Sequence, residues 1–248
     1  MSGKTYLITG ANRGIGKGIV SELLLRSETT VIAAVRNPQD DTSKALDRLP
    51  KSENSRLILI KIDSGSETDA QAAAETIQKD LGITRLDVLI ANAGISKYYG
   101  PAATTPALEV KEHFTVNALG PLLLFQAFWP LLQHSPEPKF VAVSTGAASL
   151  TDMGTLPLPV AAYGSSKAAL NYIVRKIHFE NESLVAFVIS PGWVQTEMGN
   201  GGAKAVGMEK APVTLEQSVH GILQKVDGAT RQGSGGSFLS FDDTQYAW

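Results

Sequence analysis

The sequence predicts an α/β fold: a single doubly wound parallel sheet of about seven strands, with helices on both faces. Two observations predict it. Short apolar runs of strand length alternate with segments of helical periodicity along most of the 248 residues, and this alternation is typical of parallel strands joined by crossover helices. The first apolar run also ends in a glycine-rich turn that opens a helix. No repeat or linker divides the chain, so we expect one domain over residues 1–248.

The expected elements follow one another in regular order. Apolar runs predict strands over residues 6–9, 30–35, 57–62, 87–90, 140–143, 184–189 and 237–240. Helical periodicity predicts helices over residues 15–26, 41–49, 67–81, 106–114, 116–128, a long helix through 163–174, and 214–226. Residues 197–212 are rich in glycine and small side chains, and we expect a mobile substrate loop there.

Composition excludes several classes of function. Hydrophobic residues make up 43% and charged residues 19%, and the net charge is −2, so the chain can bury a core and has no overall field that attracts nucleic acid. There is no cysteine, which excludes disulfides and thiolate metal sites and is compatible with a reducing compartment. The four histidines are scattered, so we expect no metal and a cytoplasmic protein.

No segment is expected to enter a membrane. The first residues lead directly into a strand-like run and leave no room for a signal peptide. The longest apolar stretch, around residues 119–132, contains Pro121 and Pro130, which we expect to break it. It then falls short of the roughly 20 residues that a membrane helix needs.

The glycine-rich turn between the first strand and helix is a candidate phosphate-binding loop. One glycine permits a tight turn, a second lets the backbone approach a pyrophosphate, and a third lets the helix pack close to the strand. Phosphates would then meet the positive end of the helix. The spacing differs from the general G-x-G-x-x-G fingerprint, and a simple tight turn is the alternative. The candidate residues are Gly10, Asn12, Arg13, Gly14, Ile15 and Gly16.

Arg36 follows the second strand, where dinucleotide-binding folds select their cofactor. An acidic residue there accepts a hydrogen bond from the ribose, whereas arginine accommodates a 2′-phosphate. Arg13 lies in the glycine loop and is a second candidate for the same phosphate. The two arginines favour NADP(H); the alternative is that both are solvated surface residues.

Asp63 and Ser64 follow the third strand. Ligands of open α/β sheets bind beyond the carboxyl ends of the strands, so this pair is a candidate for contact with the adenine. Asp63 is equally suited to cap the next helix.

Tyr163 and Lys167 are the candidate acid–base pair. Their spacing of four in a helical segment places them on one face, about one turn apart. A nearby ammonium favours the phenolate and is expected to lower the tyrosine pKa, which suits proton transfer to a carbonyl oxygen. A packed core tyrosine beside a solvated lysine is the alternative.

Together these segments resemble the short-chain dehydrogenase/reductase family, from Thr9 to at least Thr196. The glycine loop is similar to the cofactor loop of the family, and the arginines resemble those of its NADP-preferring members. The resemblance implies a catalytic tetrad of Asn117, Ser144, Tyr163 and Lys167. It also implies that the cofactor contacts Tyr163, Lys167, Asn92, Ala93, Gly94, Pro191, Gly192, Val194 and Thr196.

The resemblance also implies a role for each residue of the tetrad. The residues alone leave the role of Asn117 open. The resemblance has Ser144 hydrogen-bond to the substrate oxygen, Lys167 hold the nicotinamide ribose and Asn117 seat a water. From the residues alone, a buried asparagine amide equally serves to join two backbone segments.

The spacing between Ser144 and Tyr163 departs from most members of the family. The two residues are nineteen positions apart, with residues 150–160 as the excess. That length and the Phe-Leu-Ser-Phe-Asp-Asp pattern before Trp248 are similar to the branch with sniffer carbonyl reductases, C-factor proteins and fungal norsolorinic-acid-type ketoreductases.

The resemblance implies reduction of a ketone or aldehyde with NADPH. Candidate pocket side chains are mostly apolar and favour a hydrophobic or aryl carbonyl compound over a charged one; some of them alternatively serve as core or dimer contacts. They are Tyr98, Leu150, Met153, Leu156, Trp193, Met198 and Met208.

Two other functions compete with the enzyme. A cofactor-sensing regulator would keep the fold without turnover, and a signalling scaffold would use only its surface. The resemblance also implies a homodimer or homotetramer, and the apolar residues Leu122, Leu123, Leu124, Phe125, Phe128 and Trp129 favour an interface along their helix. The longer segment before Tyr163 is equally able to cover part of that surface.

Overall fold

The computed structural model describes residues 3–155 and 158–248, and its centre is a seven-stranded parallel sheet. The strand order is β3-β2-β1-β4-β5-β6-β7, so the order reverses between β1 and β4. The strands are β1 (Thr5–Thr9), β2 (Thr30–Val35), β3 (Arg56–Lys61), β4 (Val88–Ala91), β5 (Lys139–Val143), β6 (Val185–Ser190) and β7 (Phe238–Ser240). The predicted fold class is confirmed.

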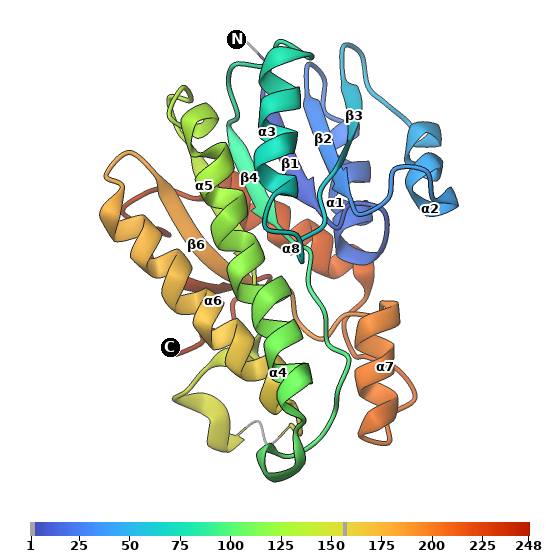
Figure 1. Ribbon diagram of the computed structural model, residues 1–248, viewed down its shortest axis with the longest axis vertical. Helices are drawn as coiled ribbons and strands as arrows, with labels where there is room; N and C mark the ends of the chain where they lie inside the picture. Colours follow the sequence, from blue (N-terminus) through green and yellow to red (C-terminus); the bar gives the residue numbers. More distant parts are fainter. Residues whose placement is uncertain (1–2, 156–157) are drawn as a thin grey trace.

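Helices cover both faces of the sheet (Figure 1). The α-helices are α1 (Gly14–Leu24), α2 (Asp41–Lys44), α3 (Asp69–Lys79), α4 (Ala107–Phe114), α5 (Gly120–Leu132), α6 (Ala161–Glu180), α7 (Glu197–Ala205) and α8 (Leu215–Gly228). In Figure 1, α3, α5 and α6 lie in front of the sheet and α1 and α8 behind it. The expected helix over residues 41–49 is shorter, because its second half is a 3₁₀ turn, Ala45–Arg48.

The alternation of side chains along each strand produces two cores. Leu7 of β1 belongs to the cluster under α3, α5 and α6, whereas its neighbours Tyr6 and Ile8 belong to the cluster under α1 and α8. Successive strand residues point to opposite faces, and a strand covered on both faces is therefore apolar throughout. This explains the continuous apolar runs in the sequence.

The expected break at the two prolines is wrong. A π turn, Thr115–Leu119, joins α4 to α5, and the helix runs without interruption from Ala107 to Leu132. Pro121 lies just after the π turn, and Pro130 lies inside α5 near its end.

By length and composition alone, the 26-residue helix Ala107–Leu132 is long and apolar enough to cross a membrane, because its most apolar 18-residue stretch has a mean hydropathy of 1.3. The core helix of a soluble protein meets the same criterion, and 56% of the most apolar stretch here is buried inside the protein. Leu124, Phe125 and Phe128 belong to the core. The apolar excess that favoured an interface is therefore partly explained by packing within the chain.

The segment expected to be a mobile loop begins as helix α7. The Thr196 hydroxyl accepts a hydrogen bond from the Gly199 amide (3.0 Å) and caps the helix. The Trp193 indole donates to the Gly199 carbonyl (2.8 Å). A side chain at Gly199 would collide with the Val194 carbonyl. The small residues here permit close packing, so their interpretation as a loop is wrong for residues 197–205.

His178 is a buried histidine near the end of α6, and 3% of its surface is exposed. Its Nδ1 accepts a hydrogen bond from the Ala186 amide of β6 (3.3 Å). Burial, followed by the nearby Arg231 guanidinium, holds the pKa of His178 below its ordinary value. Protonation would remove the acceptor from the Ala186 amide.

We expect His178 to make folding stability depend on pH. The unfolded chain takes up the proton near pH 6.5, whereas the folded chain does so at a lower pH, so stability falls as pH decreases below about 6.5. The loss is about 1.4 kcal/mol for each unit between the two pKa values. Urea unfolding between pH 5 and 7.5 measures it, and His178→Gln should flatten the profile. His220→Gln is the matched control because His220 is exposed. An unchanged slope in His178→Gln would contradict this assignment.

Candidate active site

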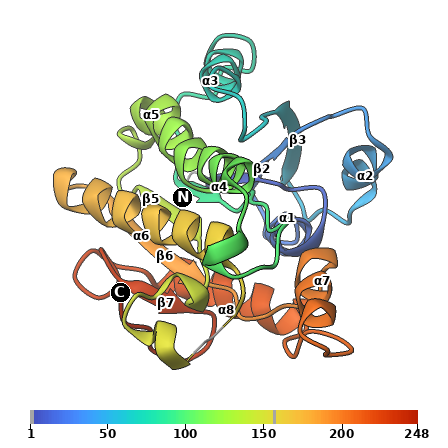
Figure 2. The ribbon, with the colours of Figure 1, turned by 60° about the horizontal axis from the view of Figure 1, so that its bottom comes forward.

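The candidate residues gather at the end of the sheet where the strands finish. This end is at the bottom of Figure 1 and is brought forward in Figure 2, where α7 and the start of α6 flank it. All strand pairs are parallel, so their carboxyl ends lie along one edge. The reversal of strand order between β1 and β4 opens a crevice at this edge in folds of this kind.

The glycine loop joins β1 to α1 in the conformation that its glycines permit. Gly10 and Gly14 have positive φ angles of 63° and 50°, which other residues rarely adopt. A side chain at Gly16 would collide with the Gly10 carbonyl. Ile15 is half-buried and packs against the core under α1. The loop therefore fits the three glycine roles that the sequence predicts.

Asn92, the residue directly after β4, holds this loop in place. Its amide Nδ2 donates to the carbonyls of Thr9 (2.9 Å) and Gly10 (3.3 Å). The Thr9 hydroxyl in turn accepts from the backbone amides of Asn92 (3.1 Å) and Ala93 (3.0 Å). Asn92 and Ala93 thus hold the loop in place.

The predicted phosphate ligands lie on the loop and just beyond β2. Asn12 donates to the hydroxyls of Thr42 (2.9 Å) and Ser43 (3.2 Å), which ties the loop to α2. Arg13 is 65% exposed and pairs with Glu197, the first residue of α7 (2.9 Å). Arg36 is exposed directly after β2.

Asp63 and Ser64 follow β3, as expected. The Asp63 carboxylate accepts from the Gly65 amide (2.9 Å) and forms a local turn. It does not cap α3, because the residue before that helix is Thr68. The capping alternative for Asp63 is therefore wrong. Ser64 is half-buried, and its carbonyl lies against Gly120.

Asn117 lies in the π turn and is fully buried. Its amide oxygen accepts from the Ile95 amide (2.8 Å), and its nitrogen donates to the Ile95 carbonyl (2.9 Å) and the Ser166 hydroxyl (3.0 Å). Both amide hydrogens are used. The side chain therefore joins the segment after β4 to α6, which favours the structural alternative over water binding by the amide.

Lys167 is a buried ammonium with 4% of its surface exposed. Its Nζ donates to the carbonyl of Val143, the last residue of β5 (2.7 Å). Burial lowers the pKa of Lys167 to about 8. A side chain at Gly94 would place its Cβ 3.4 Å from Nζ and 3.1 Å from the Asn117 amide oxygen. Glycine at this position keeps the space beside the ammonium open for another group.

Thr145, not Ser144, hydrogen-bonds with the Tyr163 hydroxyl. Ser144 is 1% exposed, and its hydroxyl donates to the Asn171 amide oxygen inside α6 (2.5 Å). The expectation that Ser144 belongs to the catalytic set is therefore wrong. Two hydroxyl residues are adjacent at the end of β5, and neighbouring residues of an extended chain point to opposite sides. Thr145 is the one that faces α6 at Tyr163.

The pKa of Tyr163 differs from the expectation. Tyr163 is half-buried, and the loss of solvent around its phenol raises the pKa to about 12, while the hydrogen bond with Thr145 offsets only part of this effect. Lys167 lies one turn further along the same helix, but its ammonium bonds to Val143. In the chain without cofactor, the expected lowering of the tyrosine pKa is therefore wrong.

The segment from Pro191 to Thr196 closes the opposite side of the glycine loop. Gly192 has a positive φ of 79°, and the Pro191 carbonyl accepts from the Ser218 hydroxyl of α8 (2.7 Å). Val194 is 3% exposed. A side chain at Gly14 would come within 3.3 Å of the Thr196 methyl group. Glycine at position 14 therefore allows the two segments to approach each other closely at this edge of the sheet.

The expected pocket residues are only partly brought together. Tyr98 donates to the Thr104 carbonyl (3.1 Å) of its own loop. Several of the apolar side chains are exposed, and Leu156 lies outside the described residues. The exposed fractions are 68% for Leu150, 57% for Met153, 39% for Met198 and 40% for Met208.

Tyr99, rather than the expected Tyr98, lies near Tyr163. It acts electrostatically on Tyr163, and a side chain at Gly202 of α7 would lie 3.3 Å from its hydroxyl. The same position is 3.7 Å from the Trp193 indole nitrogen. Tyr99 and Trp193 therefore both lie beside Gly202 of α7, and Tyr99 also raises the pKa of Tyr163. Two adjacent tyrosines gave no sequence signal to distinguish them.

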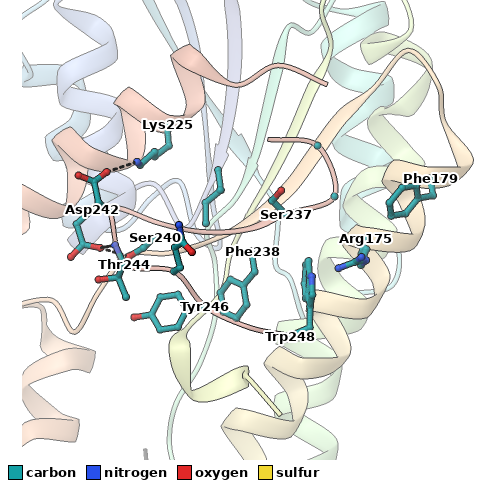
Figure 3. A pocket seen from close by; sticks show the side chains of 15 residues that line it. Arg175, Phe179, Lys225, Ser237, Phe238, Ser240, Asp242, Thr244, Tyr246 and Trp248 are labelled. Carbon is teal, nitrogen blue, oxygen red and sulfur yellow. Dashed lines mark hydrogen bonds and ion pairs between the residues drawn. The ribbon is translucent and has the colours of Figure 1, made fainter. Parts of the chain in front are cut away.

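A cavity of about 640 Å³ lies elsewhere, along β7 and the last residues of the chain (Figure 3). Arg175, Tyr246 and Trp248 are among its lining residues, and Thr145, Tyr163 and Lys167 are not. In residues 3–155 and 158–248, no three acidic, histidine or cysteine side chains are grouped so as to hold a metal ion.

Known proteins resemble the chain over nearly its whole length. The pattern of the short chain dehydrogenase family matches residues 4–206. The norsolorinic acid ketoreductase of Dothistroma septosporum is 48% identical over 96% of this chain and 90% of that protein. The norsolorinic acid ketoreductase of Aspergillus parasiticus is 45% identical over 98% of this chain and 90% of that protein.

Among solved structures, the NADPH-bound carbonyl reductase from chicken fatty liver superimposes with a TM-score of 0.87 at 29% identity, over 100% of both chains. The fold, the glycine loop, the Tyr163–Lys167 helix and these likenesses agree. The chain belongs to the short-chain dehydrogenase family of oxidoreductases.

Proposed function

We propose that the protein is an NADPH-dependent ketoreductase that reduces a hydrophobic or aryl ketone or aldehyde to the alcohol. The observation that carries the proposal is the hydroxyl pair of Thr145 and Tyr163 in one site with the buried Lys167. The names of the two fungal ketoreductases support the reaction. The NADPH in the chicken carbonyl reductase supports the cofactor.

The crevice beside the glycine loop is the place we propose for the cofactor. The loop from Gly10 to Gly16 and the start of α1 would hold the pyrophosphate, and Asp63 and Ser64 would contact the adenine. Lys167 would hold the nicotinamide ribose in the space that Gly94 leaves open. NADPH, when bound, supplies the hydride, and the protein supplies position and electrostatics.

Arg13 and Arg36 are the residues we propose for the 2′-phosphate. Both are exposed, and arginine binds phosphate through two parallel hydrogen bonds. Arg13 is already paired with Glu197, so a phosphate must compete with this carboxylate. An exposed ion pair contributes little, about 0–1 kcal/mol, whereas a phosphate carries more charge than a carboxylate. The competition therefore favours the phosphate.

Tyr163 is the proton donor in this proposal, and Thr145 donates a second hydrogen bond to the same substrate oxygen. Reduction places negative charge on that oxygen, and two preorganised donors stabilise it. A pKa of about 12 keeps Tyr163 protonated at neutral pH, as a donor must be. The ammonium of Lys167, one helical turn away, stabilises the phenolate that remains after the proton has left.

We propose that the aromatic residues Tyr99 and Trp193, together with α7, line the substrate pocket. They favour a flat apolar substrate, which agrees with the aryl ketone expected from sequence. The regulator and scaffold alternatives gain no support from the site, since neither requires Thr145, Tyr163 and Lys167 together.

We also propose a homodimer or homotetramer through α4 and α6. Large apolar side chains remain exposed on both helices, including Leu108 (66%), Tyr172 (72%) and Phe179 (63%). Exposed apolar groups of this kind are typical of contact surfaces.

The proposed function predicts NADPH oxidation with aryl and aliphatic ketones, followed by absorbance. Tyr163→Phe removes the proton donor and should lower kcat/KM about 10²–10⁴-fold. NADH, tested in parallel, should be the poorer cofactor, and Arg36→Ala should narrow the difference. NADPH binding without turnover above the level of Tyr163→Phe, across the panel, would contradict the proposal. A preference for NADH would contradict the assignment of the two arginines.

Replacing each of the adjacent hydroxyl residues tests their different roles. Thr145→Ala removes a hydrogen bond to the developing charge and should lower kcat about 10²-fold or more, whereas Thr145→Ser should restore most of it. Ser144→Ala leaves the Asn171 amide without its donor, which should cost about 1–3 kcal/mol of stability, with kcat nearly unchanged. The measurements are kcat and urea unfolding for all three variants. A larger loss of kcat in Ser144→Ala than in Thr145→Ala would show that the assignment is wrong.

A further inference from the structure

The last seven residues, Asp242–Trp248, turn back after β7 and end beside Arg175 of α6; we call them the return segment. The turn begins at Asp242, whose carboxylate accepts from the Ser240 hydroxyl (2.6 Å) and the Thr244 amide (3.0 Å). Asp242, Asp243, Thr244 and Gln245 are exposed, so this first part contributes little to the core. Tyr246 and Trp248 are half-buried and pack against the core.

Two aromatic rings anchor the return segment. Phe238 of β7 stacks on Tyr246, with ring centres 5.0 Å apart, and lies 5.6 Å from Trp248. The Arg175 guanidinium of α6 lies over the Trp248 ring at 4.6 Å. Figure 3 shows Phe238 beside both rings and Arg175 beside Trp248. Aromatic and cation–π contacts of this type stabilise the return segment against β7 and α6.

Beyond these anchors, the return segment bonds to residues 146–155, which follow Thr145. The Trp248 carbonyl accepts from both the amide (3.1 Å) and the hydroxyl (2.8 Å) of Thr151. The Ala247 amide donates to the Asp152 carboxylate (3.2 Å). The same carboxylate oxygen accepts from the Ser149 hydroxyl (3.1 Å). Three hydrogen bonds thus join two segments that are nearly 100 residues apart in sequence.

The contact continues to the catalytic residues. The Tyr246 ring lies against Gly146, where an added Cβ would come within 2.5 Å of it. Gly146 directly follows Thr145, and the Thr145 hydroxyl caps this turn by accepting from the Ala147 amide (3.3 Å). A Cβ at Gly164, beside Tyr163, would lie 3.0 Å from the Ala147 carbonyl. The turn is therefore held between Tyr246 on one side and the start of α6 on the other.

We propose that the return segment positions Thr145 against Tyr163, and that Tyr246 and Trp248 are positioning residues for the reaction. This inference rests on the proposed ketoreductase function. Residues 146–155 contain only two short 3₁₀ turns, Gly146–Ala148 and Asp152–Thr155, and Leu150 and Met153 are exposed. Two such short turns do little to fix the position of residues 146–155. The return segment adds hydrogen bonds to them from outside this stretch. A displacement of about 1 Å at a catalytic group costs about 10²-fold in rate.

Hydrogen exchange of the intact protein tests the positioning role without any turnover. Trp248→Ala and Tyr246→Ala should speed amide exchange in residues 146–155 about tenfold or more, in the range of local opening. Exchange in residues 10–16 should stay unchanged. Trp248→Phe and Tyr246→Phe keep an aromatic ring and should restore the native rates. Asp243→Asn is the matched control, because Asp243 belongs to the same segment but pairs with Lys225 (3.3 Å).

Kinetics supply the second measurement. We expect Trp248→Ala to lower kcat/KM for the ketone about tenfold or more, while the Kd of NADPH changes less than about twofold, since distant sites are independent. A merely structural role would instead lower thermal stability and NADPH binding together. Thr145→Ala combined with Trp248→Ala should lose little more activity than Thr145→Ala alone.

Two results would overturn the inference. Unchanged exchange in residues 146–155 of both alanine variants would show that the return segment does not hold them. Faster exchange together with a native kcat/KM would show that the contact between the return segment and residues 146–155 does not matter for the reaction. Absence of ketone turnover in the native chain would contradict the proposed function, and the exchange comparison would still decide whether the return segment holds the turn.

Discussion

The buried ammonium of Lys167 is the constraint on which the site depends. A charge that is 4% exposed is costly unless it is hydrogen-bonded, and the Val143 carbonyl at the end of β5 provides one partner at 2.7 Å. The space beside it exists because residue 94 is glycine. Asn117, in the π turn, fixes the backbone that follows Gly94 through its two bonds to Ile95.

These contacts make the site a property of several elements at once. Asn92 joins the segment after β4 to the end of β1, and Lys167 joins the end of β5 to α6, the helix that also carries Tyr163. The Ser166 hydroxyl of α6 bonds to Asn117 (3.0 Å) and connects the helix to the π turn. A change at any of these points would move the catalytic pair relative to the glycine loop.

The sequence was sufficient to predict the sheet, the glycine loop and the helix of Tyr163, because these depend on local periodicity and on glycines with special conformations. It was insufficient where tertiary packing decides. Glycine-rich residues 197–205 indicated mobility, whereas their small size allows α7 to pack on Val194. Ser144 and Thr145 are chemically alike and adjacent, so only the fold shows which one faces Tyr163.

The pKa values are a further case in which burial outweighs sequence proximity. Spacing alone suggested that Lys167 lowers the pKa of Tyr163, but burial acts on each group separately. It raises the pKa of Tyr163 to about 12 and lowers that of Lys167 to about 8. The pair is therefore a neutral phenol beside an ammonium that loses its proton more readily than usual, until a bound ligand changes their surroundings.

The most direct test of this account is an ultraviolet titration of the tyrosines in the protein without cofactor. The spectrum of Tyr163→Phe, subtracted from that of the native chain, isolates Tyr163 from the other five tyrosines. We expect no phenolate from Tyr163 up to about pH 10, the ordinary pKa of a free tyrosine. A Tyr163 phenolate appearing near pH 8 would contradict it and would show that Lys167, rather than burial, controls the proton.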